Sequence, residues 1–255
     1  MTLIRIRDLG YGVGGVRILD AVSLEVPQAC WFGLVGANGS GKTTLLRCLA
    51  GRLPVVRGAI CLGGQDCSQD PAARAGFFGV APDVNRLPLD LQASELIEVV
   101  SIARGGERPI LRDLHDLLEI GRLWSMPLRR MSSGMRQRIA IYLAFLGQPQ
   151  AVILDEPFNW LDPVAAYEFK QMMRLWTKDG GTLISAIHDI ASFAEYCSQG
   201  IVLSGGAVVR AYDFENKDSD CDVRALEREV YELLGGTQGW EGSSKNRIMP
   251  EAVRA

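Results

Sequence analysis

Hydrophobic and polar residues first follow a strand-like pattern. Period-two alternation at residues 3–7 and 18–26 predicts two half-buried antiparallel strands, joined by a turn that contains Gly10, Gly12, Gly14 and Gly15. A continuous apolar run at residues 30–35 predicts a strand buried on both faces. Residues 58–62 and 76–81 predict two more strands. The first third of the chain is therefore expected to be rich in sheet.

The pattern then changes to helical periodicity and changes back. Residues 92–104, 109–120 and 133–147 predict three helices with no strand between them. Strands at 151–154, 182–187, 201–203 and 207–210 then alternate with helices at 164–177 and 190–197, and a last helix is predicted at 224–234. We therefore divide the α/β chain into a core lobe (1–82 and 148–212), a helical subdomain (83–147), and a C-terminal helix with a tail (213–255).

Composition narrows the class of protein. The 255 residues are 47% hydrophobic and 22% charged, with a net charge of −3, which does not favour a nucleic acid as partner. The longest apolar run, residues 139–147, has nine residues, whereas a membrane-spanning helix needs about 20. The six cysteines form no C-x-x-C pair, so reduced thiols are expected instead of a zinc site or disulfides. Together these values predict a soluble intracellular protein.

A phosphate-binding motif follows the predicted buried strand directly. Residues 36–43 read GANGSGKT, which matches G-x-x-x-x-G-K-[ST] between a strand and a helix. In this motif the backbone N–H groups wrap a phosphate, Lys42 contacts the β- and γ-phosphates, and the Thr43 hydroxyl ligates Mg²⁺. The predicted nucleotide-binding residues here are Gly36, Asn38, Gly39, Ser40, Gly41, Lys42, Thr43 and Thr44.

A second motif ends the strand predicted at residues 151–154. The strand is followed by Asp155, Glu156 and Pro157. Because parallel strands deliver their carboxyl ends to one edge of a sheet, these carboxylates are expected beside the phosphate-binding motif. We predict that Asp155 helps to hold Mg²⁺ and that Glu156 accepts a proton from an attacking water.

Both motifs and the helical insertion between them resemble the ATP-binding cassette of ABC transporters over about residues 2–210. The resemblance implies a P-loop NTPase core with an N-terminal antiparallel β subdomain, an inserted α-helical subdomain, and ATP and Mg²⁺ as cofactors. It also implies that Tyr11 stacks on adenine, although an ordinary tyrosine in a loop fits the sequence nearly as well.

The resemblance extends to a signature sequence before the second motif and to two short motifs after it. Residues 131–135 read MSSGM where the family usually has LSGGQ, and Ser132 and Gly134 are retained. Those two residues are expected to contact a γ-phosphate, and simple N-capping of a helix is the alternative. Asp162 matches the aspartate of the family's D-loop. His188 matches the switch histidine, expected to hydrogen-bond the γ-phosphate and the attacking water.

One position departs from the family. Asp83 stands where the family has a glutamine. An aspartate can approach Mg²⁺ but offers no amide donor to the attacking water, so we expect Asp83 to support metal binding and to alter the coupling of hydrolysis to a partner. The apolar segment at residues 87–91 next to it is either core or a docking surface for a membrane subunit.

The resemblance implies an assembly. Two cassettes meet head-to-tail around two ATP molecules, and a separate transmembrane permease holds the chain peripherally at the cytoplasmic face of the inner membrane, with export as the expected direction. The alternative is a soluble ABC-type ATPase, such as the one of iron–sulfur cluster assembly. A GTPase is not favoured, because the pair Asn216-Lys217 leads into Asp218-Ser219 and does not match N-K-x-D.

Overall fold

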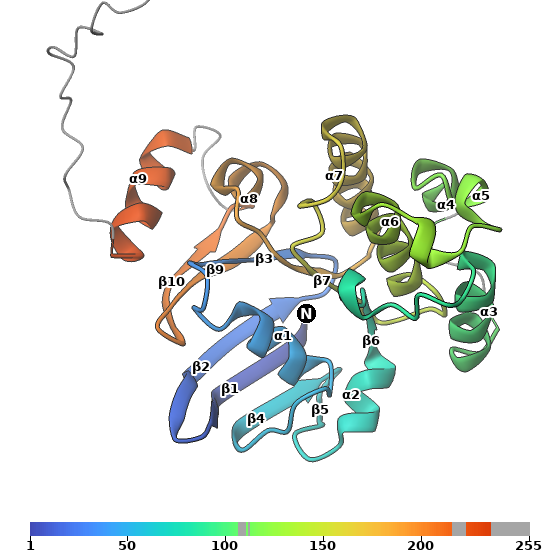
Figure 1. Ribbon diagram of the computed structural model, residues 1–255. Coiled ribbons are helices and arrows are strands. Elements are labelled where there is room, and N and C mark those ends of the chain that lie inside the picture. The colour runs from blue at the N-terminus through green and yellow to red at the C-terminus, as the bar shows by residue number, and fades with distance from the viewer. Residues whose placement is uncertain (107–110, 112, 216–222, 236–255) are drawn as a thin grey trace, which may run out of the picture.

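The computed structural model describes residues 1–106, 111, 113–215 and 223–235. Its first layer is a four-stranded antiparallel sheet in the order β2-β1-β4-β5 (Figure 1). These strands are β1 (Thr2–Val13), β2 (Val16–Pro27), β4 (Arg57–Leu62) and β5 (Gln65–Asp66). The predicted N-terminal antiparallel sheet is confirmed.

The second sheet has six strands in the order β10-β9-β3-β8-β7-β6. They are β3 (Trp31–Val35), β6 (Phe78–Val80), β7 (Ala151–Asp155), β8 (Leu183–Ala186), β9 (Gln199–Ser204) and β10 (Ala207–Asp213). All neighbours are parallel except β10, which pairs antiparallel with β9 at one edge. The carboxyl ends of β3, β8 and β7 therefore lie at the same side of the sheet.

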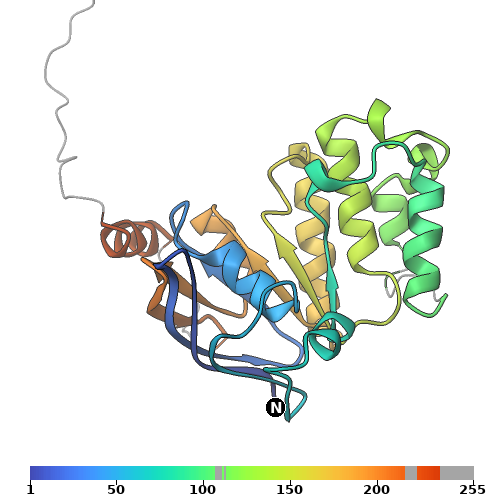
Figure 2. The same cartoon turned by 60° about the horizontal axis from the view of Figure 1, so that its bottom comes forward.

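The helices between β6 and β7 in the chain lie together and form one group, the helical group (Figures 1 and 2). This group contains η1 (Val84–Arg86), α3 (Ala93–Ala103), α4 (Leu114–Leu117), α5 (Ile120–Leu123), η2 (Leu128–Arg130) and α6 (Ser133–Ala144). The other helices are α1 (Lys42–Leu49), α2 (Pro71–Phe77), α7 (Pro163–Lys178), α8 (Ile190–Tyr196) and α9 (Val223–Leu233). Within the described residues, no helix combines the length and apolar character that crossing a membrane requires.

Two hydrophobic clusters hold these layers together. One lies under α1, where Leu45 and Leu49 pack with Ile6 of β1 and Ile153 of β7. The other joins the helical group to the six-stranded sheet, with Ile139 of α6 in the same cluster as residues of β7 and β8. The helical group therefore shares its core with the sheet. The division of the chain into a core lobe, a helical subdomain and a C-terminal part stays a prediction.

Two predicted elements were wrong in part. Residues 76–81 were expected to form one strand, but helix α2 continues to Phe77 and β6 covers only Phe78–Val80. Helix α2 begins at Pro71, a residue that suits the first turn of a helix. Asp70 caps it by accepting a hydrogen bond of 2.8 Å from the N–H of Ala73. In the N-terminal hairpin, Gly10 and Gly12 belong to β1, and only Gly14 and Gly15 make the turn, with φ of 59° and 81°.

The helix predicted at residues 109–120 also differs. Its first part includes residues outside the described ranges, and the rest forms two short helices, α4 and α5. Glu119 separates them with a left-handed φ of 52°. As predicted, Cys30, Cys48, Cys61, Cys67 and Cys197 are free thiols, and Cys221 lies outside the described residues.

Candidate functional site

The phosphate loop, residues 36–43, runs from the end of β3 into α1. Its backbone requires glycine at two places. A Cβ on Gly36 would lie 2.4 Å from the carbonyl oxygen of Leu203, and Gly41 has a φ of 107° at the helix N-cap. Gly39 also has a positive φ, 79°, but faces open space. The loop therefore presents its backbone at the start of a helix, as anion binding requires.

Lys42 is held inside this loop. Its side chain is only 5% exposed, and its Nζ donates to the carbonyl oxygens of Gly36 at 2.7 Å and Ala37 at 3.2 Å. Burial lowers the pKa of the Lys42 ammonium, and the nearby carboxylates of Glu156 and Asp155 oppose that shift. The cation of the phosphate loop thus faces the two carboxylates at the carboxyl end of β7.

Ser40 adds a polar atom that suits a phosphate ligand. Among the described residues its Oγ is one of the few buried side-chain atoms with no hydrogen-bond partner. Such a donor costs stability unless a ligand satisfies it. Asn38 and Gly39 are exposed in the same loop, and Thr44 is half-buried in α1.

Asp155 and Thr43 bring two oxygen ligands together. Asp155 ends β7, and its carboxylate hydrogen-bonds the side chain of Thr43. Although Asp155 reaches the surface, desolvation by the surrounding protein raises the pKa of its carboxyl, against the lowering effect of that hydrogen bond. The described residues contain no group of three or more His, Cys, Asp or Glu side chains able to hold a metal. One carboxylate and one hydroxyl nevertheless fit Mg²⁺, which takes few protein ligands when phosphates supply others.

Glu156 lies next to this pair with its carboxylate held by two side chains. Its Oε1 is 2.5 Å from His188 Nε2, and its Oε2 accepts a hydrogen bond of 2.7 Å from Asn159 Nδ2. The backbone of Glu156 has a left-handed φ of 51°, and its N–H donates to the carbonyl of Ala186 at 3.3 Å. The predicted residues Lys42, Asp155, Glu156 and His188 are therefore gathered at one edge of the sheet.

Ser132 and Gly134 lie at the N-terminus of α6. Ser132 is the N-cap, and its Oγ accepts a hydrogen bond of 3.2 Å from the N–H of Met135. A Cβ on Gly134 would lie 2.5 Å from the carbonyl oxygen of Trp160. The main contacts of α6 are with β6, β7, η1, α3 and α5, whereas those of α1 are with β2 and β7. The signature residues therefore belong to the helical side of the molecule.

Three residues that sequence reasoning did not select connect this part of the site. Asn159 contacts Glu156 as described. The Nε2 of Gln137 donates a hydrogen bond of 3.2 Å to the carbonyl of Pro157. Arg138 forms ion pairs with Glu119 at 2.6 Å and with Asp162 at 3.0 Å. Only Asn159 had a sequence signal, since it lies three residues after Glu156, the spacing of a turn.

The remaining predicted residues are engaged elsewhere. Tyr11 is half-buried in β1 opposite Leu19 and packs against the cluster under α1. Asp83 is exposed and caps η1, because its Oδ1 accepts a hydrogen bond of 2.9 Å from the N–H of Asn85. Adenine stacking by Tyr11 and metal binding by Asp83 both stay predictions.

The apolar segment at residues 87–91 is divided between core and surface. Leu87 is buried and Leu91 packs against the core of the helical group, whereas Leu89 is 41% exposed. The two ends of this segment therefore belong to the core, and its middle, residues 88–90, is exposed.

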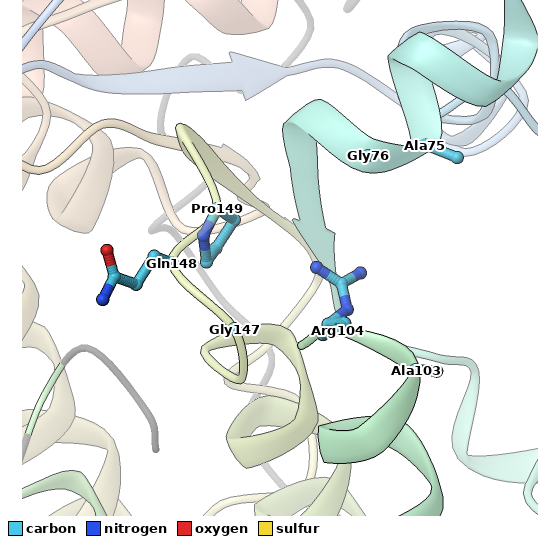
Figure 3. Close-up of a pocket in the computed structure, with 7 residues that line it drawn as sticks. All are labelled: Ala75, Gly76, Ala103, Arg104, Gly147, Gln148 and Pro149. Carbon is cyan, nitrogen blue, oxygen red and sulfur yellow. The ribbon is translucent and has the colours of Figure 1, made fainter. Parts of the chain in front are cut away.

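Figure 3 shows a cavity with a lining of its own. It has a volume of 560 Å³ and is lined by Ala75, Gly76, Ala103, Arg104, Gly147, Gln148 and Pro149. Burial lowers the pKa of the Arg104 guanidinium, which donates to the carbonyl of Phe78 at 3.1 Å. None of the predicted site residues lines the cavity.

Comparison with known proteins gives consistent matches. The family model described as ABC transporter matches residues 19–159. The chain is 31% identical to the ABC-type transporter ATP-binding protein EcsA of Bacillus subtilis, over 82% of this chain and 86% of that protein. It is also 31% identical to the Nod factor export ATP-binding protein I of Rhizobium etli, over 92% of this chain and 75% of that protein. A solved structure of an ATP-binding subunit of an ABC transporter superposes with a TM-score of 0.79 at 27% identity, over 92% of this chain and all of that one.

Proposed function

Because the chain belongs to the ABC transporter family of ATP-binding proteins, we propose that it couples ATP hydrolysis to export through a separate transmembrane permease. As an ABC-type ATPase, it is an ATP hydrolase. The observation that carries the hydrolytic part of the proposal is the convergence of the phosphate loop, Asp155, Glu156 and His188 at one edge of the six-stranded sheet.

The phosphate loop binds the triphosphate of ATP. Lys42 exchanges its two carbonyl partners for phosphate oxygens, and Ser40 gains the hydrogen-bond partner that it lacks. Thr43 and Asp155 would hold Mg²⁺, which neutralises the charge that develops on the phosphates. Tyr11 contacts the adenine, and Asp83 approaches the metal from the start of the helical group.

Glu156 is the general base. Its carboxylate accepts a proton from the water that attacks the γ-phosphate. His188 lies against Oε1 of that carboxylate, so the imidazole orients the base and offers a hydrogen bond to the phosphate or the water. Glu156 and His188 are half-exposed, with side chains 32% and 39% accessible, and a second cassette that covers them would exclude water from the reaction.

A second copy of a cassette supplies the missing side of the site. Ser132 and Gly134 stand at the N-terminus of α6, where backbone N–H groups and the helix dipole attract an anion. We infer a head-to-tail dimer in which these residues of one cassette contact the γ-phosphate bound by the other. That contact exists only while the triphosphate is intact, so hydrolysis opens the dimer.

The transport role rests on the relatives. Their names describe transporter ATP-binding proteins, one of them for export, which favours export over iron–sulfur cluster assembly. The chain would then lie at the cytoplasmic face of the membrane, held by its permease. When it is expressed with a membrane protein encoded beside it, we expect both to co-purify in detergent. Persistent separation of the two, with the chain bound instead to a soluble complex, would support the alternative.

Replacement of Glu156 by Gln tests the hydrolytic role. The two side chains have the same shape, but the amide cannot take a proton, so we expect kcat to fall by at least about 100-fold. ATP binding should persist, and gel filtration should show an ATP-dependent dimer. Lys42→Ala is the contrasting variant, because it should lose ATP binding itself. An E156Q enzyme with the normal rate would rule out Glu156 as the base.

A further inference from the structure

The carboxylate of Glu156 is fixed at both of its oxygens by donors from different segments. His188, which follows β8, lies against Oε1 at 2.5 Å, and Asn159, in the turn before α7, donates to Oε2 at 2.7 Å. One donor alone leaves a carboxylate free to rotate about its last bond. Two donors on the two oxygens fix the plane of the group, and each oxygen still has a lone pair for a water proton.

Asn159 belongs to a turn that is itself held in place. Its backbone N–H donates to the carbonyl of Glu156 at 3.4 Å, which closes the turn. On one side, the buried amide of Gln137 donates to the carbonyl of Pro157. On the other, Asp162 caps α7 through the N–H of Ala165 at 3.0 Å. The donor of Asn159 is therefore carried by a backbone with fixed ends.

Helix α6 supplies the remaining contacts of this turn. Gly134 approaches the carbonyl of Trp160 so closely that a Cβ would lie 2.5 Å from it, and Arg138, 15% exposed, reaches Asp162 at 3.0 Å. The first turns of α6 thus touch the segment at residues 157–162 in three places. A displacement of α6 relative to the sheet would move this segment, and Asn159 with it.

We propose that Asn159 is a positioning residue that orients the general base and makes its orientation depend on the position of α6. This inference rests on the proposed function, in which Glu156 activates water. Asn159 touches no reacting atom in this role, because it acts through the carboxylate. His188 holds the same carboxylate from the sheet side. Glu156 is therefore oriented only when the helical group keeps this position relative to the sheet. Hydrolysis then becomes sensitive to any partner that shifts the helical group.

Replacement of Asn159 by Ala tests the orienting role. The variant removes the donor to Oε2 and leaves His188 in place. We expect kcat to fall about tenfold, within the range that a small misplacement of a catalytic group produces. The Kd for ATP, measured with a fluorescent ATP analogue, should stay within about twofold of the wild-type value, because the phosphate loop is untouched. Circular dichroism and the melting temperature check that the variant is folded.

Asn159→Asp is the isosteric control. It fills the same space but places a second carboxylate against Glu156, and the repulsion between them should displace the base. We expect a loss of kcat larger than that of Asn159→Ala, again without a loss of ATP affinity. Asn159→Gln keeps the amide donor on a longer chain and should recover part of the wild-type rate.

A double-variant cycle separates positioning from a general structural role. Once Glu156 is replaced by Gln there is no base to orient, so Asn159→Ala should leave the residual rate of that enzyme unchanged. If Asn159→Ala lowers both rates by the same factor, or leaves wild-type kcat intact, the inference is wrong. If Glu156→Gln is itself fully active, the failure belongs to the proposed function instead.

Discussion

The two loops that form the site are built in different ways. The phosphate loop, residues 36–43, takes its shape from its own backbone between two consecutive elements, β3 and α1. The segment at residues 156–162 takes its shape from side chains far away in the chain: His188, Gln137 and Arg138 lie 32, 20 and 24 positions from their partners. The first loop is a local structure, and the second is a product of tertiary packing.

The two loops also differ in how their polar groups are satisfied. In the phosphate loop, the Oγ of Ser40 has no partner and Lys42 is held by two backbone carbonyls, so the loop is prepared to exchange these contacts for phosphate. In the segment at residues 156–162, the side chains of Glu156, Asn159 and Asp162 are all hydrogen-bonded within the chain. In the proposed function, local geometry therefore provides phosphate binding, and long-range contacts provide the alignment of the base.

The sharpest test of the local loop is Gly36→Ala. The added Cβ would meet the carbonyl of Leu203 at 2.4 Å and the Oγ of Ser40 at 2.6 Å, so backbone must move. We expect the free energy of unfolding to fall by about 1–3 kcal/mol, the usual cost of overpacking, and ATP affinity to fall at least about tenfold because the N–H groups lose their alignment. Urea denaturation and ATP titration measure the two effects.

Gly39→Ala is the matched control for that variant. Gly39 lies in the same loop and, unlike Gly36, has a positive φ of 79°, but no atom lies within 4 Å of the added carbon. Its variant therefore carries only the strain of a left-handed alanine, about 1–2 kcal/mol, and no steric clash. If both variants lose ATP affinity equally, close approach at Gly36 does not shape the loop.

A smaller effect is expected from Arg138→Met in the second segment. Methionine keeps the apolar stem but removes the ion pairs with Glu119 at 2.6 Å and Asp162 at 3.0 Å. ATP affinity should not change, while kcat should fall by about threefold to tenfold, since a small misplacement costs less than the 100-fold of a 1 Å error. Arg138→Lys keeps the positive charge, so its kcat should lie between that of the wild type and that of Arg138→Met. Loss of ATP affinity in Arg138→Met would mean that the two loops are not independent.

Prediction from sequence succeeded where the pattern is local. The phosphate loop, the strand before it and the alternation of strands and helices after residue 148 depend on neighbours in the chain, and the structure contains them. It failed at residues 76–77, where the capped helix α2 continues into residues predicted as strand. The turn spacing placed Asn159 near Glu156, but it did not identify Asn159 as a partner of the carboxylate, because their hydrogen bond is a side-chain contact that no periodicity indicates.

By itself, the sequence determined the fold class and the family, and it predicted the residues that bind phosphate, because strand, loop and helix lie within one short stretch and each residue type there has a steric or electrostatic reason. Only the tertiary structure decided which donors hold Glu156 and how α6 meets the segment at residues 156–162. Those contacts join residues from separate elements, and their geometry exists only after the sheet and the helices have packed against a common core.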